Sequence, residues 1–355
     1  MSWETLSNQA ITAAGVVYFL ALMAHLVEWS ALRTRPVQRA STPAVRVASG
    51  VVSLRDGSFL ASSGQATGST DAASGSTDGA SAAGAGADDE GTSYRIAMFG
   101  RLGLYLTIIA CLAHGVALFS RGMAAGRVPW GNMYEFTLTG SFVVAAGYLL
   151  LRKRFGLSWM GPIVDAFVLV LLMVAVLWLY SPVEPLTEAL LSPWLVIHVM
   201  SAIIATGAFT LGGITSALYL VKARAESRGT PSDRGYVARL PSPASLDRIS
   251  YRIHAFAFPV WTFAVLISGP IWAHQAWSSY WNWDPKEVVA FITWVVYAAY
   301  LHARATAGWR GRKAAMVALV GVATLWFNFI GINYFSTTSQ HSYANGAPVV
   351  DLRFR

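Results

Sequence analysis

The chain has 355 residues, of which 55% are hydrophobic and 12% charged, and its formal net charge is +8. A soluble domain carries about 25% charged residues, so this composition excludes an ordinary water-soluble globular protein. The apolar residues come in blocks of roughly 20, the length of a helix that spans a bilayer. A spanning helix also satisfies its own backbone hydrogen bonds. We therefore expect an all-α, polytopic membrane protein.

Eight apolar blocks predict eight transmembrane helices. In chain order they lie near residues 10–31, 97–119, 133–151, 161–180, 194–221, 253–273, 286–304 and 314–335. Basic residues gather in every second connection, beginning with the first, which holds Arg33, Arg35 and Arg39. Because cytoplasmic loops carry such an excess, we expect both termini on the outer side. The positive charge then reflects topology and contact with membrane lipid, and nucleic-acid binding is not expected.

The expected domain organisation follows from these spans. It comprises a first transmembrane helix over 1–32, a cytoplasmic flexible linker over 33–95, a seven-helix membrane domain over 96–345 and a short outer tail over 346–355. Residues 61–93 are rich in Gly, Ser, Ala and Thr, which is typical of flexible connectors. Residues 1–9 carry no basic side chain, so we expect the first helix to be retained rather than cleaved as a signal peptide.

Capping signals open three helices that enter from the outer side. Asn132 and Glu135 fit a capping box, and so do Asp284 and Glu287, with Pro285 at the first helical position. Ser192-Pro193 opens the fifth span in a similar way. Glu135 and Glu287 are either caps alone or functional carboxylates, and the sequence leaves both interpretations open.

The segment 272–287 reads WAHQAWSSYWNWDPKE and holds five aromatic residues within twelve positions. Tryptophan and tyrosine collect at membrane interfaces, so an interfacial belt is one explanation. The density favours a second one, a surface for a large planar ligand whose polar edge indole N–H groups could bind.

The seven histidines fall at two levels of the predicted bundle. The outer half holds His114, His198, His274 and His341, and the inner half holds His25, His254 and His302. His302 follows Pro285 by 17 residues, about 25 Å along a helix. Intramembrane ionisable residues are functional hypotheses by default. Each could instead be a buried residue bonded to a nearby carbonyl, which is our preferred interpretation of His25, His254 and His274.

Haem fits this pattern better than a simple metal ion. Haem iron needs one or two axial imidazoles and a broad apolar slot, whereas no spacing here suits tetrahedral zinc. The single cysteine, Cys111, lies in the middle of an apolar span, so it can form neither an internal disulfide nor a Cys-x-x-Cys pair. Any thiol chemistry must therefore come from a partner.

Several motifs together resemble one family. The run 272–287, followed by YLHAR at 300–304, GWRGRK at 308–313 and HSY at 341–343, is similar to the WWD-domain haem handlers of system II cytochrome c biogenesis, the CcsA/ResC family. The segments 127–136, 192–199 and 246–252 also resemble family segments. The resemblance covers essentially residues 95–345.

The resemblance implies two haem sites. At an outer site, His198 and His341 would be axial ligands of haem b, beside a platform formed by Trp272, Trp277, Tyr280, Trp281, Trp283 and Asp284. At a deeper site His302 would be a ligand, and its partner histidine would come from a CcsB/ResB-type subunit. The other implied partners are apocytochrome c and a thioredoxin-like thiol reductant.

The implied activity needs no acid–base catalytic residue in this chain, which would form part of a cytochrome c synthetase complex. The implied location is a bacterial cell membrane, or a thylakoid membrane in a plastid. Two features depart from the family pattern: the long 61–93 segment and His274, which stands where such proteins often have another polar residue. His274 could compete with His198 or His341, and His25 is an alternative inner ligand.

Two other functions remain open from the residues. One is a haem exporter or chaperone without ligation activity, which would need the same sites. The other is a b-type electron-transfer membrane cytochrome, which generally pairs histidines about four turns apart on one helix. Only His254 and His274 share a predicted span, and their 20-residue separation corresponds to about 30 Å, which is too far.

Overall fold

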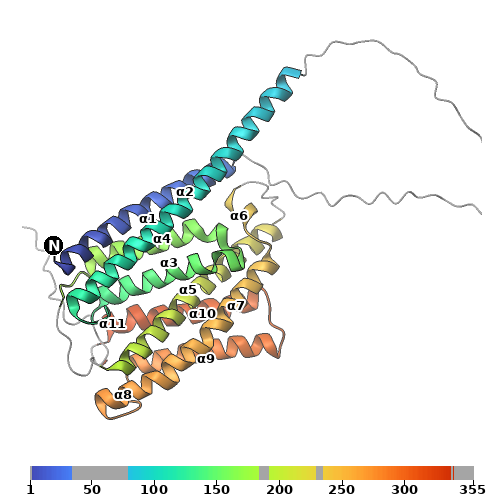
Figure 1. Cartoon of the computed structure of the whole chain (residues 1–355). Coiled ribbons are helices and arrows are strands. Elements are labelled where there is room, and N and C mark those ends of the chain that lie inside the picture. Colours follow the sequence, from blue (N-terminus) through green and yellow to red (C-terminus); the bar gives the residue numbers. More distant parts are fainter. Residues whose placement is uncertain (1, 34–78, 184–191, 229–234, 337–338, 340–355) are drawn as a thin grey trace, which may run out of the picture.

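The computed structural model of the chain describes residues 2–33, 79–183, 192–228, 235–336 and 339. Within these residues all regular structure is helical (Figure 1). The elements are α1 (Trp3–Arg33), α2 (Gly79–Ala125), α3 (Met133–Phe155), η1 (Leu157–Met160), α4 (Gly161–Trp178), α5 (Pro193–Ser227), α6 (Tyr236–Arg239), α7 (Pro243–Thr262), η3 (Phe263–Ser268), α8 (Gly269–Trp277), α9 (Pro285–Ala305), α10 (Arg312–Trp326), η4 (Phe327–Gly331) and α11 (Ile332–Phe335).

Eight stretches of helix are long and apolar enough to cross a membrane, as predicted. They are Trp3–Ala31, Gly91–Ala125, Met133–Phe155, Leu157–Trp178, Pro193–Ser227, Pro243–Trp277, Pro285–Ala305 and Arg312–Phe335. The sixth joins α7, η3 and α8, and the eighth joins α10, η4 and α11. The all-α, multi-pass membrane fold is thereby confirmed.

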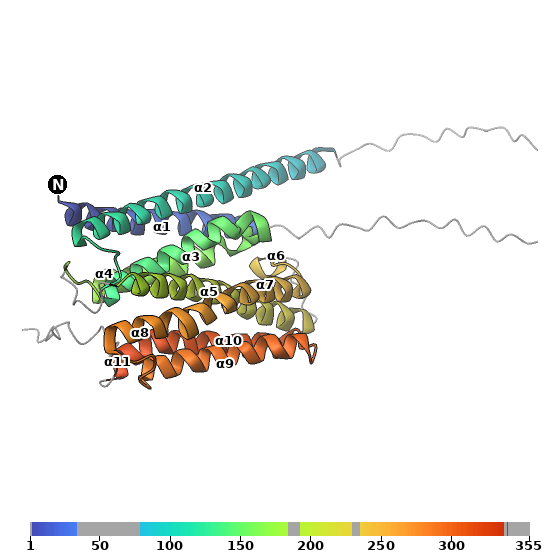
Figure 2. The same cartoon turned by 60° about the horizontal axis from the view of Figure 1, so that its bottom comes forward.

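The spanning helices run side by side in two groups (Figures 1 and 2). α1 to α4 share a core that includes Tyr148 and Met160, while α5, α7, α9 and α10 share a second core that includes Phe209 and Tyr297. α5 packs against α3 in the first group and α7, α8 and α10 in the second. In the most apolar 18-residue stretch of each span, the share of residues that are buried is highest for α5, at 56%, and lowest for α9, at 17%. The bundle is therefore centred on α5, and α9 leaves most of its surface uncovered.

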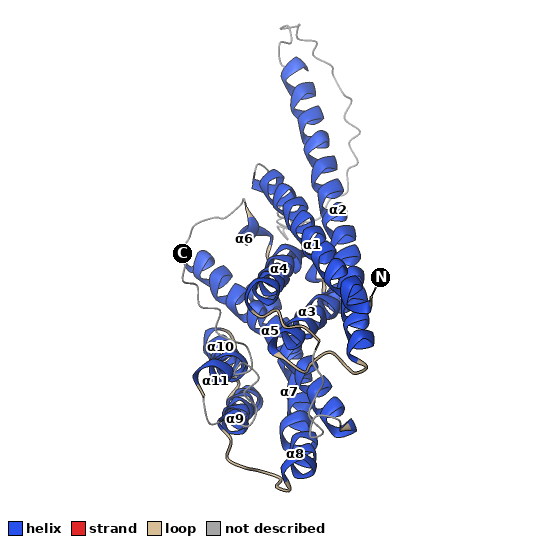
Figure 3. Cartoon of the chain, turned by 90° about the vertical axis from the view of Figure 1, so that its left-hand side faces the viewer, coloured by secondary structure: helices blue, strands red, loops and turns tan. Residues whose placement is uncertain are grey.

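Helix α2 begins at Gly79, inside the stretch that the sequence predicts to be a linker over 33–95. Residues 79–90 contain five alanines, and alanine has the highest helix propensity. In this part of the segment the helix propensity of alanine outweighs the flexibility of the glycine and serine residues. The part of α2 before Gly91 lies outside the membrane-spanning stretch and projects beyond the other helices (Figure 3).

Two spans contain a π-helical turn, η3 and η4. Pro270 explains the first, because proline has no N–H and its ring clashes with the carbonyl four residues earlier. The hydrogen-bond ladder shifts, and the Gly269 N–H bonds to the carbonyl of Ala264, five residues before it. Such turns alter which carbonyl groups are available and occur frequently at functional sites.

The N-terminus, the loop between α8 and α9, and α11 lie at one end of the bundle (Figure 2). The loop between α9 and α10 lies at the other end (Figure 2). It carries Arg310, and Arg312 and Lys313 follow in the first turn of α10. The basic loop is thus separated from the aromatic segment by the length of the bundle. That the aromatic end faces outward stays a prediction from the charge pattern.

Glu135 serves the fold rather than completing a capping box. The Asn132 side chain accepts a bond from the Glu135 backbone N–H at 2.9 Å, as a cap should. The Glu135 carboxylate turns instead to Arg121 Nε at 3.0 Å and Arg127 Nη1 at 2.7 Å, and it accepts the Gly131 N–H at 2.7 Å. Arg121 and Glu135 are fully buried. The carboxylate therefore ties α2, the following loop and α3 together.

Replacing Glu135 by Ala leaves Arg121 as a buried charge without its main counterion, which costs about 3–5 kcal/mol. We expect that loss in the free energy of unfolding, measured by detergent titration of the purified chain. Glu226→Ala is the matched control, because its carboxylate is 52% exposed and 3.8 Å from Lys222, and such a pair contributes less than about 1 kcal/mol. Equal effects of the two substitutions would contradict this role for Glu135.

Candidate functional site

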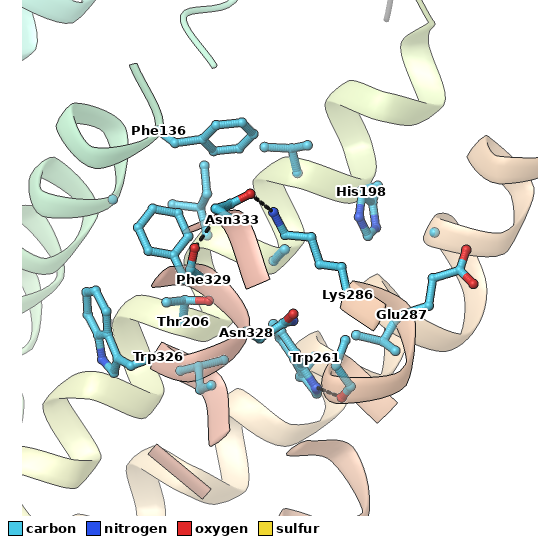
Figure 4. Close-up of a pocket in the computed structure, with 18 of the residues that line it drawn as sticks. Phe136, His198, Thr206, Trp261, Lys286, Glu287, Trp326, Asn328, Phe329 and Asn333 are labelled. Atoms are coloured by element: carbon cyan, nitrogen blue, oxygen red, sulfur yellow. Dashed lines mark hydrogen bonds between the residues drawn. The ribbon is translucent and has the colours of Figure 1, made fainter. Parts of the chain in front are cut away.

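A cavity of about 1430 Å³, including space open to solvent, lies at the junction of the two helix groups. It is bounded by α3, α5, the η3–α8 segment, α9 and the η4–α11 segment. Apolar side chains form most of its wall, and both π-helical turns contribute to it. Four residues of the predicted outer site line it: His198, Trp272, Tyr280 and Trp281. Figure 4 shows His198 and Lys286 on its wall.

His198 reaches the cavity from the first turns of α5. The helix begins at Pro193 after the Ser192 cap, whose hydroxyl accepts the Trp194 N–H at 3.2 Å. The Nδ1 atom of His198 lies 2.9 Å from the carbonyl oxygen of Ala264. Because a carbonyl can only accept, Nδ1 carries the hydrogen and the lone pair of the neutral ring lies on Nε2. A neutral imidazole binds a metal ion through such a lone pair. The hydrogen bond from Nδ1 holds the ring in one orientation.

The acceptor for His198 depends on the π-helical turn. The Ala264 carbonyl accepts the Gly269 N–H, the Ser268 hydroxyl at 3.2 Å and His198 Nδ1. Gly269 is required at its position by close approach: an added Cβ would lie 2.9 Å from the Ala264 oxygen and 3.1 Å from His198 Cε1. Pro270, Gly269 and Ala264 together therefore fix the position of the imidazole.

Trp272 extends this arrangement as a planar surface. Its ring stacks on His198 with centroids 6.0 Å apart and an interplanar angle of 11°. Trp277 meets it edge-on at 4.8 Å. Trp272 is 2% exposed, so its place is fixed by packing. Trp277 supports Trp272 and is not among the described lining residues of the cavity.

The outer part of the aromatic segment is open to its surroundings. Trp283 is 78% exposed and Tyr280 is 60% exposed, and Trp281 meets Trp283 edge-on at 6.0 Å. Trp283 has φ of 57°, a left-handed conformation that is rare and costly for a bulky residue. His274, for which a buried position was expected, is exposed, because it lies in the last turn of α8 and stacks on the exposed Tyr280 at 4.3 Å. It is not among the described lining residues of the cavity.

Asp284 and Glu287 hold the strained loop in place, as the capping-box prediction requires. Glu287 Oε2 accepts the backbone N–H groups of Asn282 at 2.9 Å and Asp284 at 3.2 Å. Asp284 Oδ1 accepts the Lys286 N–H at 2.8 Å and the hydroxyl of Ser339 at 2.8 Å. Asp284 is 5% exposed and is not among the described residues that line the cavity. It therefore anchors the loop rather than forming part of the aromatic surface.

His302 lies apart from this cavity. It is exposed near the C-terminal end of α9, and Val295 and Ile292, two and three turns earlier on the helix, are exposed as well. Arg304, two residues later, is held in place by Asp247, whose oxygens accept its Nη atoms at 2.8 and 2.9 Å. The structure thus separates His302 from His198, in agreement with the prediction that these two histidines lie in the inner and outer halves of the bundle. His341 lies outside the described residues.

The other buried histidines belong to the packing of the bundle. His254 Nδ1 bonds to the Ser250 carbonyl at 2.7 Å, the arrangement expected of a core histidine. His114 is fully buried between the rings of Tyr18 and Phe142.

His25 differs from the expectation in one respect. Its contacts are carboxylates rather than a carbonyl, Glu28 at 3.2 Å and Asp165 at 3.6 Å. It lies in the α1–α4 group, whereas His302 is on α9.

Sequence reasoning missed several residues of the cavity. Ala264 acts through its backbone, and the signal in the sequence for a shift of the hydrogen-bond ladder there is Pro270, near the end of the predicted span 253–273. Lys286 was seen only as part of a helix start, and Asn328 and Asn333 were overlooked. An amide in an otherwise apolar span is itself a signal, because polar groups in membrane helices are costly and usually functional.

Comparison with known proteins gives a consistent result. Residues 130–339 match the family described as Cytochrome C assembly protein, and this range contains every element that borders the cavity. The cytochrome c biogenesis protein CcsA of Guillardia theta is 33% identical over 258 residues, which cover 68% of this chain and 85% of that protein. The CcsA of Synechococcus elongatus is 34% identical over 277 residues, covering 66% and 85%, and that of Porphyra purpurea is 31% identical over 285 residues, covering 70% and 89%.

Gly269→Ala tests whether close approach fixes the His198 ring. The added methyl group must displace the imidazole or the Ala264 carbonyl, so we expect the Nδ1-protonated signal of His198 to shift or disappear in ¹⁵N-histidine NMR spectra of the purified chain. Gly140→Ala is the matched control, because Gly140 also lines the cavity and a Cβ there meets nothing within 4 Å. An unchanged signal in Gly269→Ala would contradict the proposed constraint.

Proposed function

Because this chain belongs to the CcsA family of cytochrome c assembly proteins and functions in cytochrome c biogenesis, we propose that its cavity binds haem b for attachment to c-type cytochromes. The observation that carries the proposal is the orientation of the His198 ring on the cavity wall. Its Nε2 lone pair, set by the bond from Nδ1 to Ala264, lies on the wall of a mainly apolar cavity. An axial imidazole and an apolar slot are the two requirements of a haem site.

The aromatic segment fits the task of presenting haem at the membrane surface. Trp272 is a fixed planar wall beside His198. Trp283 and Tyr280 are exposed in the loop between α8 and α9, which lies at one end of the bundle (Figure 2). The charge pattern assigns this end to the outer side. Trp277, Trp281 and Asp284 support the same segment. Haem held here would have its edge accessible to a second protein.

His341 is the proposed second ligand of the outer site. Ser339, two positions before it, bonds to Asp284, so the chain leading to His341 is attached to the aromatic loop. The segment after α11 thus connects directly to the segment before α9. Two imidazoles would saturate the iron and protect it from oxygen chemistry, and the histidine of the apocytochrome Cys-x-x-Cys-His segment would displace one of them.

The chemistry of attachment needs positioning more than acid or base. Each apocytochrome thiol adds across one haem vinyl group: the C–S bond forms at one carbon, the hydrogen goes to the other, and no net oxidation occurs. This chain would orient the vinyl edge and exclude side reactions, and no catalytic residue is assigned to it. Cys111 is buried, so the thiols would be kept reduced by a separate thioredoxin-like protein.

His302 is the proposed ligand of an inner site through which haem reaches the cavity. It is exposed on α9, the span with the smallest buried share, and apolar residues are exposed on the same helix. A ligand on an uncovered helix face suits a site completed by another subunit. We assign the second histidine to a CcsB/ResB-type partner, with which this chain would form the synthetase.

The test is cytochrome c maturation in cells together with the haem spectrum of the purified chain and its partner. We expect His198→Ala with His341→Ala to abolish maturation and lower haem occupancy at the outer site at least tenfold, since even the loss of a supporting residue costs 10–100-fold. His302→Ala should lower delivery while outer-site binding of added haem persists. Lys153→Ala, at an exposed position on α3, is the control.

Normal maturation in the double variant, or colourless wild-type protein from haem-replete cells, would refute the proposed haem site. Normal maturation in His302→Ala would remove only the inner step.

A further inference from the structure

A second buried polar cluster lies in the α1–α4 group, away from the cavity. His25 and Glu28 are in the last third of the spanning part of α1, Trp3–Ala31, and Asp165 is on α4. The side chain of Asp165 is fully buried, that of His25 nearly so, and that of Glu28 is 24% exposed. None of the three is among the described lining residues of the cavity. Ionisable side chains inside a membrane are costly and usually functional.

The two ring nitrogens of His25 face different carboxyl groups. Nδ1 lies 3.2 Å from Glu28 Oε2, and because a carboxylate can only accept, Nδ1 carries the hydrogen. The lone pair of the neutral ring is then on Nε2. This atom is buried, has no hydrogen-bond partner among the described residues and lies 3.6 Å from Asp165 Oδ2. A charge-assisted bond is about 2.7–2.9 Å long, so His25 and Asp165 do not form a closed ion pair.

Two glycines hold the His25 ring in this position. An added Cβ at Gly103 of α2 would lie 2.6 Å from His25 Cε1, and one at Gly161 of α4 would lie 3.0 Å from His25 Nε2. The same position at Gly161 is 2.9 Å from the hydroxyl oxygen of Tyr148. The imidazole is therefore enclosed by the backbone of two helices, which keeps its Nε2 beside Asp165.

Thr107 on α2 indicates where the proton of the cluster lies. Its hydroxyl oxygen is 2.9 Å from the Gly103 carbonyl oxygen and 2.9 Å from Asp165 Oδ2. A hydroxyl has one hydrogen, and threonine in a helix can donate it to the carbonyl four residues before. The carboxyl group of Asp165 then completes the second bond by donating a hydrogen of its own. A neutral Asp165 also avoids a buried charge without a counterion at hydrogen-bond distance.

The other titratable groups around the cluster come from four helices. The phenol and thiol groups are those of Tyr18 on α1, Cys111 on α2, Tyr148 on α3 and Tyr236 on α6. Such groups are neutral near pH 7. Arg152 on α3 is a cation, and it interacts with the Tyr148 hydroxyl. Within this set, Glu28, His25 and Asp165 are therefore the groups that can exchange a proton near neutral pH.

We propose that Asp165 is the buried end of a proton-binding site, and that His25 and Glu28 connect it with the inner side of the membrane. Chains of Asp, Glu and His side chains relay protons in membrane proteins. Within the described part of the chain, no cluster of three or more His, Cys, Asp or Glu side chains is arranged to hold a metal ion, which favours a proton as the ligand. The inference does not rest on the proposed haem site.

Release of the proton changes the tautomer of His25. The O–H bond of Asp165 breaks as its proton moves to Nε2. The N–H bond at Nδ1 breaks as that proton moves to the Glu28 carboxylate and from there to water on the inner side. One proton leaves, no electron moves, and His25 stays neutral with its hydrogen on Nε2. It then donates to the Asp165 carboxylate, and the Thr107 hydroxyl can turn from Gly103 to the same carboxylate.

The test follows Asp165 and His25 separately in the full-length chain in nanodiscs. Infrared spectra of protein with ¹³C-labelled aspartate report the C=O band of a protonated carboxyl group, and ¹⁵N-histidine NMR spectra report the tautomer of His25. We expect an acid band at neutral pH that Asp165→Asn removes, and an Nδ1–H signal that His25→Gln removes. Raising the pH should abolish the band and move the His25 hydrogen to Nε2 in the same pH range.

The role of His25 as the connection is tested by rate. After a rapid rise in pH, the Asp165 acid band should decay roughly 100-fold more slowly in His25→Gln than in the wild type, because a positioned proton acceptor contributes about 10²–10⁴-fold. Glu28→Gln should also slow the decay and leave the band at neutral pH in place. His274→Gln is the matched control, because His274 is exposed and on α8, and it should leave the rate unchanged.

Three results would overturn the proposal. The first is a closed ion pair, seen as no acid band at neutral pH and a His25 ring with hydrogen on both nitrogens. The second is a decay rate that His25→Gln does not change. The third is a shift of the His25 signal when haemin is added, which would make the ring an iron ligand instead. Should Asp165→Asn not fold, Thr107→Val replaces it: loss of the hydroxyl beside Asp165 should shift the acid band, and an unshifted band refutes its assignment to Asp165.

Discussion

The carbonyl oxygen of Ala264 is the group on which the geometry of the cavity depends. It accepts bonds from a backbone amide, a hydroxyl and His198 Nδ1. In a membrane, backbone polar groups must be satisfied within the protein, so a helix ordinarily has no carbonyl available for a side chain of another helix. Here the Ala264 carbonyl accepts the Gly269 N–H in the π-helical turn before Pro270 and bonds to His198 in addition. His198 is thereby held in a ligand-competent form by a backbone carbonyl.

A second device holds the aromatic loop at the end of the bundle. Trp283 has a left-handed backbone conformation and remains largely exposed. Glu287 accepts the backbone N–H groups on either side of it, and Asp284 accepts the Lys286 N–H. Ser339 joins the loop to the segment that leads to His341. Strain of this kind persists only where the surroundings fix it, and it is frequent at functional sites. The caps that start α9 therefore also present the aromatic surface.

Much of the fold could be predicted from composition, because spans about 20 residues long are dictated by the bilayer. The caps at Asn132, Ser192 and Asp284 could be read because they rest on local side-chain geometry. The beginning of α2 could not, since alanine propensity competes with glycine content in residues 79–90.

The site was predictable only in part. The place of His198 in the outer half of the bundle followed from helix position, and its place beside the aromatic residues was implied by the family resemblance. Its bond to Ala264 depends on a shift of the hydrogen-bond ladder that composition does not encode. Glu135 illustrates the same limit: the capping pattern was present, but tertiary contacts with Arg121 and Arg127 determined where its carboxylate lies. The functional assignment of His302 rests on resemblance and on its exposure on α9.

The central claim is that His198 Nε2 binds haem iron in this cavity, and chemical rescue tests it most directly. In a His302→Ala background, the absorption and electron paramagnetic resonance spectra of bound haem are compared in protein with His198 intact and in His198→Gly, with and without added imidazole. The account predicts a low-spin spectrum with His198, its loss in His198→Gly, and its recovery with imidazole, which fits the space left by the ring. An unchanged low-spin spectrum in His198→Gly without imidazole would contradict it.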